Sequence, residues 1–237
     1  MKWKNVTLAQ FQQTDQINSR QDLSAIDRVL YSVCVLYDKT EYEVDNEKPE
    51  RVVNWIEEAK ALFESDIAVK AANRIGKYNI SYDVSAATFG QYIELAFFIN
   101  NNPVKHAHFI LATMATKWLR KRKEVEHRVK ADYFLRQPVT KVFGSVKSIQ
   151  QSFDDFNKQY STLFGIDQEV SGNVQNEDFN KHHGWIYSAT RVKEHEGITL
   201  EETFALPVRR ALNALVYIKA KDKYDVQQLR KSPPIIK

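Results

Sequence analysis

The sequence is poor in the residues that punctuate a chain. Its 237 residues include only 7 glycines and 6 prolines, while 43% of the residues are hydrophobic. An all-β sandwich or barrel needs a turn roughly every ten residues, and those turns draw heavily on glycine and proline. The sequence therefore predicts a mainly α-helical fold: a helical bundle with one small β-hairpin at about residues 67–84 and an extended C-terminal tail.

Cysteine and long apolar runs are also scarce. The single cysteine, Cys34, excludes an internal disulfide, and its place on the apolar stripe of a predicted helix indicates a small buried hydrophobe. No segment approaches the ~20 apolar residues of a membrane span, and the N-terminus lacks the apolar core of a signal peptide. We therefore expect a protein of a reducing compartment that does not enter a membrane.

Recognisable catalytic and phosphate-binding motifs are missing. The chain has no Walker loop, no GxGxxG, no GxSxG and no zinc-ribbon spacing. The most metal-like cluster is His182 and His183 with Asp178 nearby and His195 further on, but adjacent histidines point to different faces of a helix. His106 and His108 are too close in sequence to share a helical face, so we interpret them as surface residues. We predict no catalytic residue, no metal site and no cofactor, and hence no enzyme.

The charge is nearly balanced, with 34 basic against 30 acidic residues and a formal net charge of +4. One basic strip stands out on a helix expected to run into it: Lys117, Arg120, Lys121, Arg122, Lys123, Arg128 and Lys130. A strip of this kind can follow a nucleic-acid backbone. Because Glu124 and Glu126 dilute its field, we favour a solvated helix face or a rim that docks an acidic patch of another protein.

Local patterns place several elements. Capping boxes, in which a threonine and a glutamate or glutamine three residues later satisfy each other's backbone amides, predict helix starts at Thr40, Thr88 and Thr199. Alternation of apolar and polar residues from Tyr78 to Val84, with Gly76-Lys77 as the turn, predicts the hairpin. A lone hairpin is marginal in water, so it must pack on helices, pair with other strands or be completed by a neighbouring chain.

The most regular pattern is a seven-residue repeat from Thr140 to Phe164. Its apolar positions alternate spacings of four and three: Val142, Val146, Ile149, Phe153, Phe156, Tyr160 and Leu163. Bulky phenylalanine and tyrosine are poor knobs for a regular coiled-coil dimer. We therefore favour a core-facing helix over an intermolecular coiled coil, although both remain open.

Composition suggests three regions along the chain. These are a helical domain over residues 1–165, a loop or linker over 166–178, and a C-terminal helical segment with an extended tail over 179–237. The last region should hold a helix near Phe179–Glu194 and a second from Thr199 that kinks or restarts at Pro207. Pro233-Pro234 excludes a helix through the tail.

Two stretches carry a resemblance. One is Trp3-Lys-Asn-Val-Thr-Leu-Ala-Gln-Phe-Gln12 with Leu36-Tyr37-Asp-Lys-Thr-Glu-Tyr-Glu-Val-Asp45. The other joins Gly184-Trp185-Ile-Tyr-Ser-Ala-Thr190, Gly197-Ile-Thr-Leu-Glu-Glu-Thr203 and Leu206-Pro-Val-Arg-Arg-Ala-Leu-Asn-Ala-Leu-Val-Tyr217. Both are similar to segments of tail-assembly and virion proteins of tailed phages that infect gut Bacteroides-type bacteria. The resemblance covers about a third of the chain, at its two ends, and its motifs are packing motifs.

The resemblance implies a non-enzymatic structural component of a tailed phage particle, in the neck, connector or tail ring. Such a chain would be a homo-oligomer within a symmetric assembly, packed against other phage structural proteins in a virion assembled in the host cytoplasm. We expect its contacts to use aromatic residues: Trp3, Phe153, Phe156, Tyr160 and Trp185. Alternatives are a tail-assembly chaperone for a tape-measure protein and a nucleic-acid-binding accessory protein. The long heptad-patterned helix departs from small tail-assembly chaperones, which favours a fixed virion part.

Overall fold

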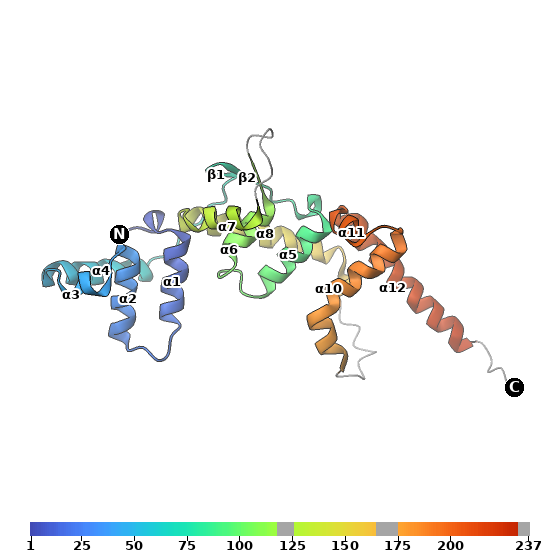
Figure 1. The fold of residues 1–237 in the computed structure, drawn as a ribbon, viewed down its shortest axis with the longest axis horizontal. Coiled ribbons are helices and arrows are strands. Elements are labelled where there is room, and N and C mark those ends of the chain that lie inside the picture. Colours follow the sequence, from blue (N-terminus) through green and yellow to red (C-terminus); the bar gives the residue numbers. More distant parts are fainter. Residues whose placement is uncertain (118–125, 165–174, 232–237) are drawn as a thin grey trace. The chain divides into compact units, whose positions relative to one another are not determined.

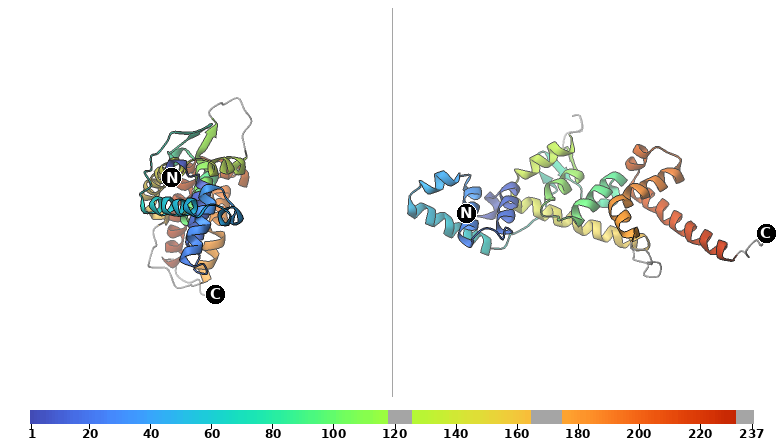
Figure 2. Two further views of the ribbon diagram at one scale, coloured as in Figure 1. Left: turned by 90° about the vertical axis from the view of Figure 1, so that its left-hand side faces the viewer. Right: turned by 60° about the horizontal axis from the view of Figure 1, so that its bottom comes forward.

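A computed structural model describes residues 1–117, 126–164 and 175–231, and Figures 1 and 2 show its ribbon. The described chain is mainly helical with a small three-stranded antiparallel sheet, which confirms the predicted fold class. The predicted extended tail, residues 232–237, lies outside the described residues.

The chain divides into two compact units, each assembled from two separate stretches of sequence. Unit 1 comprises Met1–Tyr82 and Phe98–Ile149, and unit 2 comprises Asp83–Phe97 and Gln150–Lys237. This division replaces the expected regions 1–165, 166–178 and 179–237. The prediction assumed that each region is continuous in sequence. Residues 83–97 instead hydrogen-bond with the C-terminal helices, in the second clasp described below.

Unit 1 contains the N-terminal helices, the sheet and the helices around it. In chain order these are η1 (Trp3–Asn5), α1 (Leu8–Asn18), α2 (Ala25–Tyr37), α3 (Glu41–Asp45), α4 (Pro49–Glu64), β1 (Arg74–Ile75), β2 (Tyr78–Ile80), α6 (Ala107–Met114), β3 (Ala115–Lys117), α7 (His127–Leu135) and the first part of α8 (Val139–Lys158).

Unit 2 contains a short N-terminal stretch and the C-terminal helices. These are η2 (Val84–Ala86), most of α5 (Phe89–Asn100), the last part of α8, α9 (Ser161–Phe164), α10 (Gln175–Glu196), α11 (Leu200–Ala205) and α12 (Val208–Lys231). Helix α10 therefore begins inside the segment expected to be a linker, and the helix expected to kink or restart at Pro207 restarts there.

Helix starts follow the predicted capping chemistry. The boxes at Thr40 and Thr199 are both formed, and Thr88 exchanges the two equivalent hydrogen bonds with Gln91, at 3.0 and 3.3 Å. Each pairing satisfies backbone amides that have no acceptor inside their own helix. Two further boxes, at Thr7 and Ser24, open α1 and α2 and were not predicted.

The predicted hairpin is present, and its turn is the expected Gly76-Lys77. Gly76 has a φ of +56°, which a two-residue hairpin turn with glycine first requires. The hairpin is completed within unit 1 by a third strand: β2 pairs with β3 in antiparallel register, with Ile80 opposite Ala115. The side chains of Ile75, Tyr78 and Ile80 are buried.

The heptad-patterned segment forms α8, which ends at Lys158, followed by the short helix α9. The expected helix to Phe164 is thus interrupted before Ser161. Six of its seven seam positions are buried within the chain: Val142, Val146, Ile149, Phe153, Phe156 and Tyr160. The seam is therefore part of a core, as favoured over an intermolecular coiled coil.

Unit 1 is closed by a backbone contact between the starts of α1 and α8. Thr7 and Pro138 form an isolated antiparallel bridge, in which the Leu8 amide donates to the Gln137 carbonyl and the Val139 amide donates to the Val6 carbonyl, both at 2.9 Å. The first amide of a helix has no acceptor in its own helix. Here two such amides are satisfied across a long sequence separation, and we call this arrangement the first clasp.

Unit 2 repeats the arrangement at the starts of α5 and α12. Thr88 and Pro207 form the bridge, the Phe89 amide donates to the Leu206 carbonyl at 2.8 Å, and the Val208 amide donates to the Ala87 carbonyl at 3.0 Å. This is the second clasp. Both clasps have a short 3-10 helix before the threonine, a glutamine three residues after it, and valine after the proline. The two units thus share one repeated supersecondary module.

Gly144 in α8 provides a test of the packing in unit 1. A Cβ atom at this position would overlap backbone atoms of Lys70, whereas a Cβ at Gly90 would meet Phe204 at 3.3 Å. We expect Gly144→Ala to destabilise unit 1 by about 3 kcal/mol despite its better helix propensity. Gly90→Ala should stay within about 1 kcal/mol of wild type. Urea unfolding monitored by circular dichroism measures both, and equal stabilities would contradict this packing.

Candidate functional site

Unit 2 carries a groove of about 520 Å³ between α10 and α12, next to α9. Its apolar lining residues include Leu163, Trp185, Leu215 and Ile218. The remaining lining residues are Gly184, Tyr187, Ser188, Arg191, Lys219 and Asp222. A largely apolar hollow lined by a few polar groups is the usual form of a binding site.

Trp185 joins this groove to the aromatic core of unit 2. Its ring centroid lies 5.7 Å from that of Tyr92 and 6.3 Å from that of Phe89, in edge-on geometry. Tyr92 in turn stacks on Phe153 at 5.3 Å and donates a 2.6 Å hydrogen bond to Asn157 Oδ1. Burial raises the pKa of the Tyr92 hydroxyl above its ordinary value. The wall of the groove is therefore held in place by a packed aromatic cluster.

Charged groups also line the groove. Arg191 Nη2 contacts both carboxylate oxygens of Asp222 at 2.9 Å, which joins α10 to α12 and raises the pKa of the guanidinium. Lys219 Nζ donates to the Thr162 carbonyl at 2.6 Å. Arg191 and Lys219 against Asp222 leave the lining with one net positive charge.

Large apolar side chains are exposed beside the groove and along α12. Tyr217 and Tyr224 are 56% and 59% exposed. Other exposed apolar residues are Ile186 and Tyr187 on α10 and Val216 and Val226 on α12. These residues were not predicted from the sequence. The available signal was the seven-residue spacing of Tyr217 and Tyr224, which places both on the side of α12 away from its buried residues.

Four of the five aromatics expected to make intermolecular contacts are instead buried in their own unit. Phe153, Phe156 and Tyr160 belong to the core seam of unit 2. Trp3, expected to be exposed, is only 8% exposed, because η1 turns its ring onto Phe63 and its Nε1 donates to the Ser65 carbonyl at 3.1 Å. Trp185 alone of the five lines the groove, where it is half-buried.

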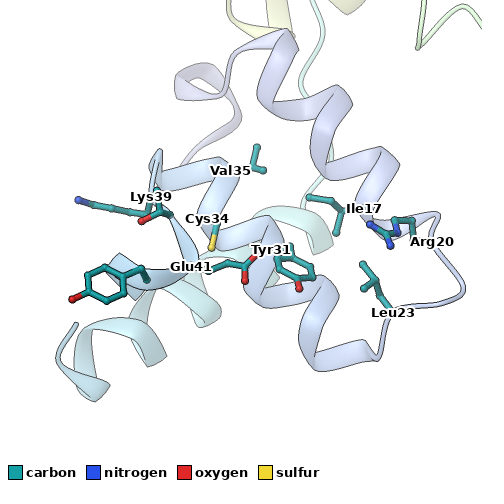
Figure 3. A pocket seen from close by; sticks show the side chains of 10 residues that line it. Ile17, Arg20, Leu23, Tyr31, Cys34, Val35, Lys39 and Glu41 are labelled. Carbon is teal, nitrogen blue, oxygen red and sulfur yellow. The ribbon is translucent and has the colours of Figure 1, made fainter. Parts of the chain in front are cut away.

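Unit 1 has a second pocket, of about 720 Å³, formed by α1, α2 and the start of α3 (Figure 3). Ile17, Leu23 and Val35 contribute apolar surface, and the half-buried Cys34 has its pKa raised by burial. Two of its charged lining residues are already paired nearby, Arg20 with Asp22 and Lys39 with Glu43. This pocket combines no groups that indicate a particular chemistry.

The histidines of unit 1 differ from the expectation of surface residues. His106 and His108 are half-buried, and together with His127 they surround the ring of Phe109, with centroid distances of 6.3, 4.2 and 5.8 Å. The turn before α6 brings the first two together despite their spacing. Burial lowers the pKa of His108 to about 4, with a smaller contribution from the two neighbouring imidazoles and an opposing one from Asp132.

The lowered pKa of His108 predicts that unit 1 loses folding stability in acid. Because its folded pKa of about 4 lies below the unfolded value of about 6.5, the unfolded state binds more protons between these pH values. Stability is fully present above about pH 6.5 and falls as the pH drops toward 4. Between pH 7 and pH 5 we expect a loss of about 1 kcal/mol, less than the pKa difference alone gives because part of the ring meets solvent.

Urea unfolding of wild type and His108→Gln at the two pH values measures this contribution. The glutamine keeps a polar group beside Gln12 Nε2, which lies 3.5 Å from His108 Nδ1, but it does not titrate. Wild type should lose more stability than the variant. Equal losses in the two proteins would show that His108 is not the responsible group.

The basic strip is only partly within the described residues. Lys117 ends strand β3 and does not lie on a helix as expected, because α6 stops at Met114 and the chain pairs with β2. Arg128 and Lys130 lie on α7, where Lys130 Nζ donates to the Ala115 carbonyl at 3.2 Å. Arg120, Lys121, Arg122 and Lys123 lie outside the described residues. Nucleic-acid binding by this strip stays a prediction.

Metal and membrane features were searched over the described residues. They contain no group of three or more histidine, cysteine, aspartate or glutamate side chains that could hold a metal ion. Of the histidines considered as a candidate cluster, His183 is exposed and the His195 ring packs 5.2 Å from that of Tyr217. None of the helices in the described stretches is both long enough and apolar enough to span a membrane.

Comparison with known proteins found no relative. No protein-family model, no curated protein and no solved structure matches the chain. The class that the structure itself defines is a helical protein of two units, each closed by the same clasp, with a surface groove on unit 2.

Proposed function

We propose that the chain is a non-enzymatic structural component of a tailed bacteriophage particle, in the neck, connector or tail ring. It works by packing against neighbouring chains, as a homo-oligomer and with other phage structural proteins. The observation that carries the proposal is the apolar surface of unit 2, where exposed Tyr187 lines the groove of about 520 Å³ and Tyr217 and Tyr224 are exposed along α12. Exposed apolar surface of this kind typically marks a protein–protein contact.

The resemblance of the two chain ends to phage virion and tail-assembly proteins supports the same proposal. The second resembling stretch contains Trp185 and Tyr217, and it supplies α11 and the first half of α12. Repeated heterologous contacts between such surfaces close into a ring when the rotation between neighbours allows it. No catalytic residue is needed for this role.

A tail-assembly chaperone for a tape-measure protein is the second candidate. A groove with a largely apolar lining also suits transient binding of an apolar segment. The two candidates differ in what remains in the finished particle, because a structural component stays in it and a chaperone leaves.

The deciding experiment is quantitative mass spectrometry of purified particles of the phage that encodes the chain. We expect the chain in a fixed number of copies per particle, comparable with those of other neck or tail proteins. Absence from intact particles, with presence in infected cells, would instead favour the chaperone.

Exposed tyrosines provide a residue-level test in the same system. Tyr217→Ser with Tyr224→Ser alters two exposed residues of α12, so stability should change by only about 0.5 kcal/mol or less per site. We expect about ten-fold lower incorporation into particles, because each lost aromatic contact weakens packing. Tyr42→Ser in unit 1, where the side chain is 77% exposed, is the matched control and should incorporate normally. Equal incorporation of all three proteins would remove unit 2 as the packing surface.

A further inference from the structure

The second half of α12 lies outside the packed part of unit 2. Every residue from Lys219 to Gln228 is exposed, and Figures 1 and 2 show this half of the helix running beyond α10 and α11. A short stretch of helix has little stability of its own in water and gains most of it by packing one face. A partner on one face of this stretch would therefore stabilise it.

Helix α10 already covers one side of α12. Asp222 contacts Arg191 Nη2 through both of its carboxylate oxygens, each at 2.9 Å. Ala220 and Tyr224 each lie two residues from Asp222, and a two-residue step turns a helix by roughly 200°. Both residues therefore lie on the side opposite the ion pair with α10, where the Tyr224 side chain is 59% exposed.

Tyr217 extends this side toward the start of α12. It lies two helical turns before Tyr224, and it is 56% exposed although its ring packs 5.2 Å from that of His195. We call Tyr217, Ala220 and Tyr224 the outer face of α12. The face offers two aromatic rings for packing and two hydroxyl groups that donate hydrogen bonds.

Lysines flank the outer face. Lys221 and Lys223 precede and follow Asp222, so each is turned by roughly 100° from it, one toward each edge of the outer face. Both are exposed, and neither forms an ion pair with another described residue. Helix α12 carries seven lysine and arginine residues against two aspartates. The outer face therefore repels a copy of itself and attracts an acidic surface.

Helix α4 of unit 1 presents an acidic surface. Glu57 lies two residues from the buried Trp55 and Ala59, so it points away from the core. Glu50 and Glu64 lie two turns before and after it and are also exposed. Within the described stretches, none of these three glutamates has an ion-pair partner. We call them the acidic face of α4.

The two faces match in spacing and in chemistry. The glutamates of the acidic face and the tyrosines of the outer face both repeat every seven residues, which is roughly 10.5 Å along a helix. Packing the two helices side by side therefore brings each tyrosine hydroxyl near a carboxylate, with the lysines on the flanks. On α4, exposed Val53 and Ala61 lie one turn before and after Glu57 and supply apolar area for the tyrosine rings.

We propose that the outer face of α12 binds the acidic face of α4 in a second copy of this chain. The contact is heterologous, because one copy contributes unit 2 and the other unit 1, and its repetition links copies head to tail. This names the partner of the exposed tyrosines in the proposed function and rests on that function. Exposed ion pairs contribute little each and are screened by salt, so the contact weakens as the salt concentration rises.

Sedimentation velocity of the full-length chain, from about 1 to about 100 μM, measures the association. We expect association that grows with concentration at about 0.1 M salt, where the Debye length is about 10 Å. It should be clearly weaker at about 1 M salt, where that length is about 3 Å.

Charge reversal locates the contact. Glu57→Lys with Glu64→Lys reverses the acidic face, and Lys221→Glu with Lys223→Glu reverses the flanks of the outer face. Each double variant should associate at least about ten-fold more weakly than wild type, because like charges then meet. A chain with all four substitutions, or an equimolar mixture of the two variants, again pairs opposite charges and should associate within about three-fold of wild type.

Matched controls carry the same charge changes at exposed positions outside both faces. These are Glu194→Lys with Glu201→Lys, and Lys141→Glu with Lys147→Glu. Both controls should associate like wild type. Recovery in the chain with four substitutions also shows that the reversed residues do not act through misfolding.

The outcomes are distinct. Weakening in both double variants, with recovery in the chain with four substitutions, supports the inference. A wild-type chain that stays monomeric to about 100 μM, reversed variants that associate normally, an absence of recovery, or equal weakening in the controls each overturns it. Particle mass spectrometry does not depend on this contact, so a chain that is found in virions but does not self-associate refutes this inference and leaves the virion role standing.

Discussion

The architecture depends on a small backbone contact made twice. In each clasp, two helices begin side by side, and each gives its first amide to a carbonyl that precedes the other helix, as Leu8 does with Gln137 and Phe89 with Leu206. Amides at helix starts must find acceptors outside their helix, and burial makes an unmet amide costly. The clasp meets this requirement by joining segments far apart in sequence. It therefore joins the start of α1 to that of α8, and the start of α5 to that of α12.

The two helices that start from the proline side of the clasps differ in the length of their apolar seams. Equivalent helices start from both clasps, but the apolar seam of α8 continues through Phe153 and Phe156, whereas α12 has Asp222 and Asp225 at the corresponding positions. The seam of α12 thus stops after Ile218, where the groove lies. A face that is buried on α8 is only half-buried on α12, where Asp222 pairs with Arg191 of α10.

Features set by residues close together in the sequence were predictable, whereas contacts between segments far apart in the sequence were not. The capping boxes at Thr40, Thr88 and Thr199, the Gly76 turn and the buried seam of α8 all follow from spacings within a few residues. The clasps escaped notice because their backbone hydrogen bonds have no side-chain pattern of their own. The shared Thr-x-x-Gln and Pro-Val segments were the available signal. Trp3 was misjudged because its burial depends on Phe63, far along the chain.

Amide hydrogen exchange tests the central claim most directly. If the clasps hold the units together, the amides of Leu8, Val139, Phe89 and Val208 exchange only when a unit unfolds. They should then be among the most protected amides of the protein, whereas amides near Tyr224 in the exposed half of α12 exchange rapidly. Fast exchange at the four clasp amides, comparable with that near Tyr224, would contradict the account.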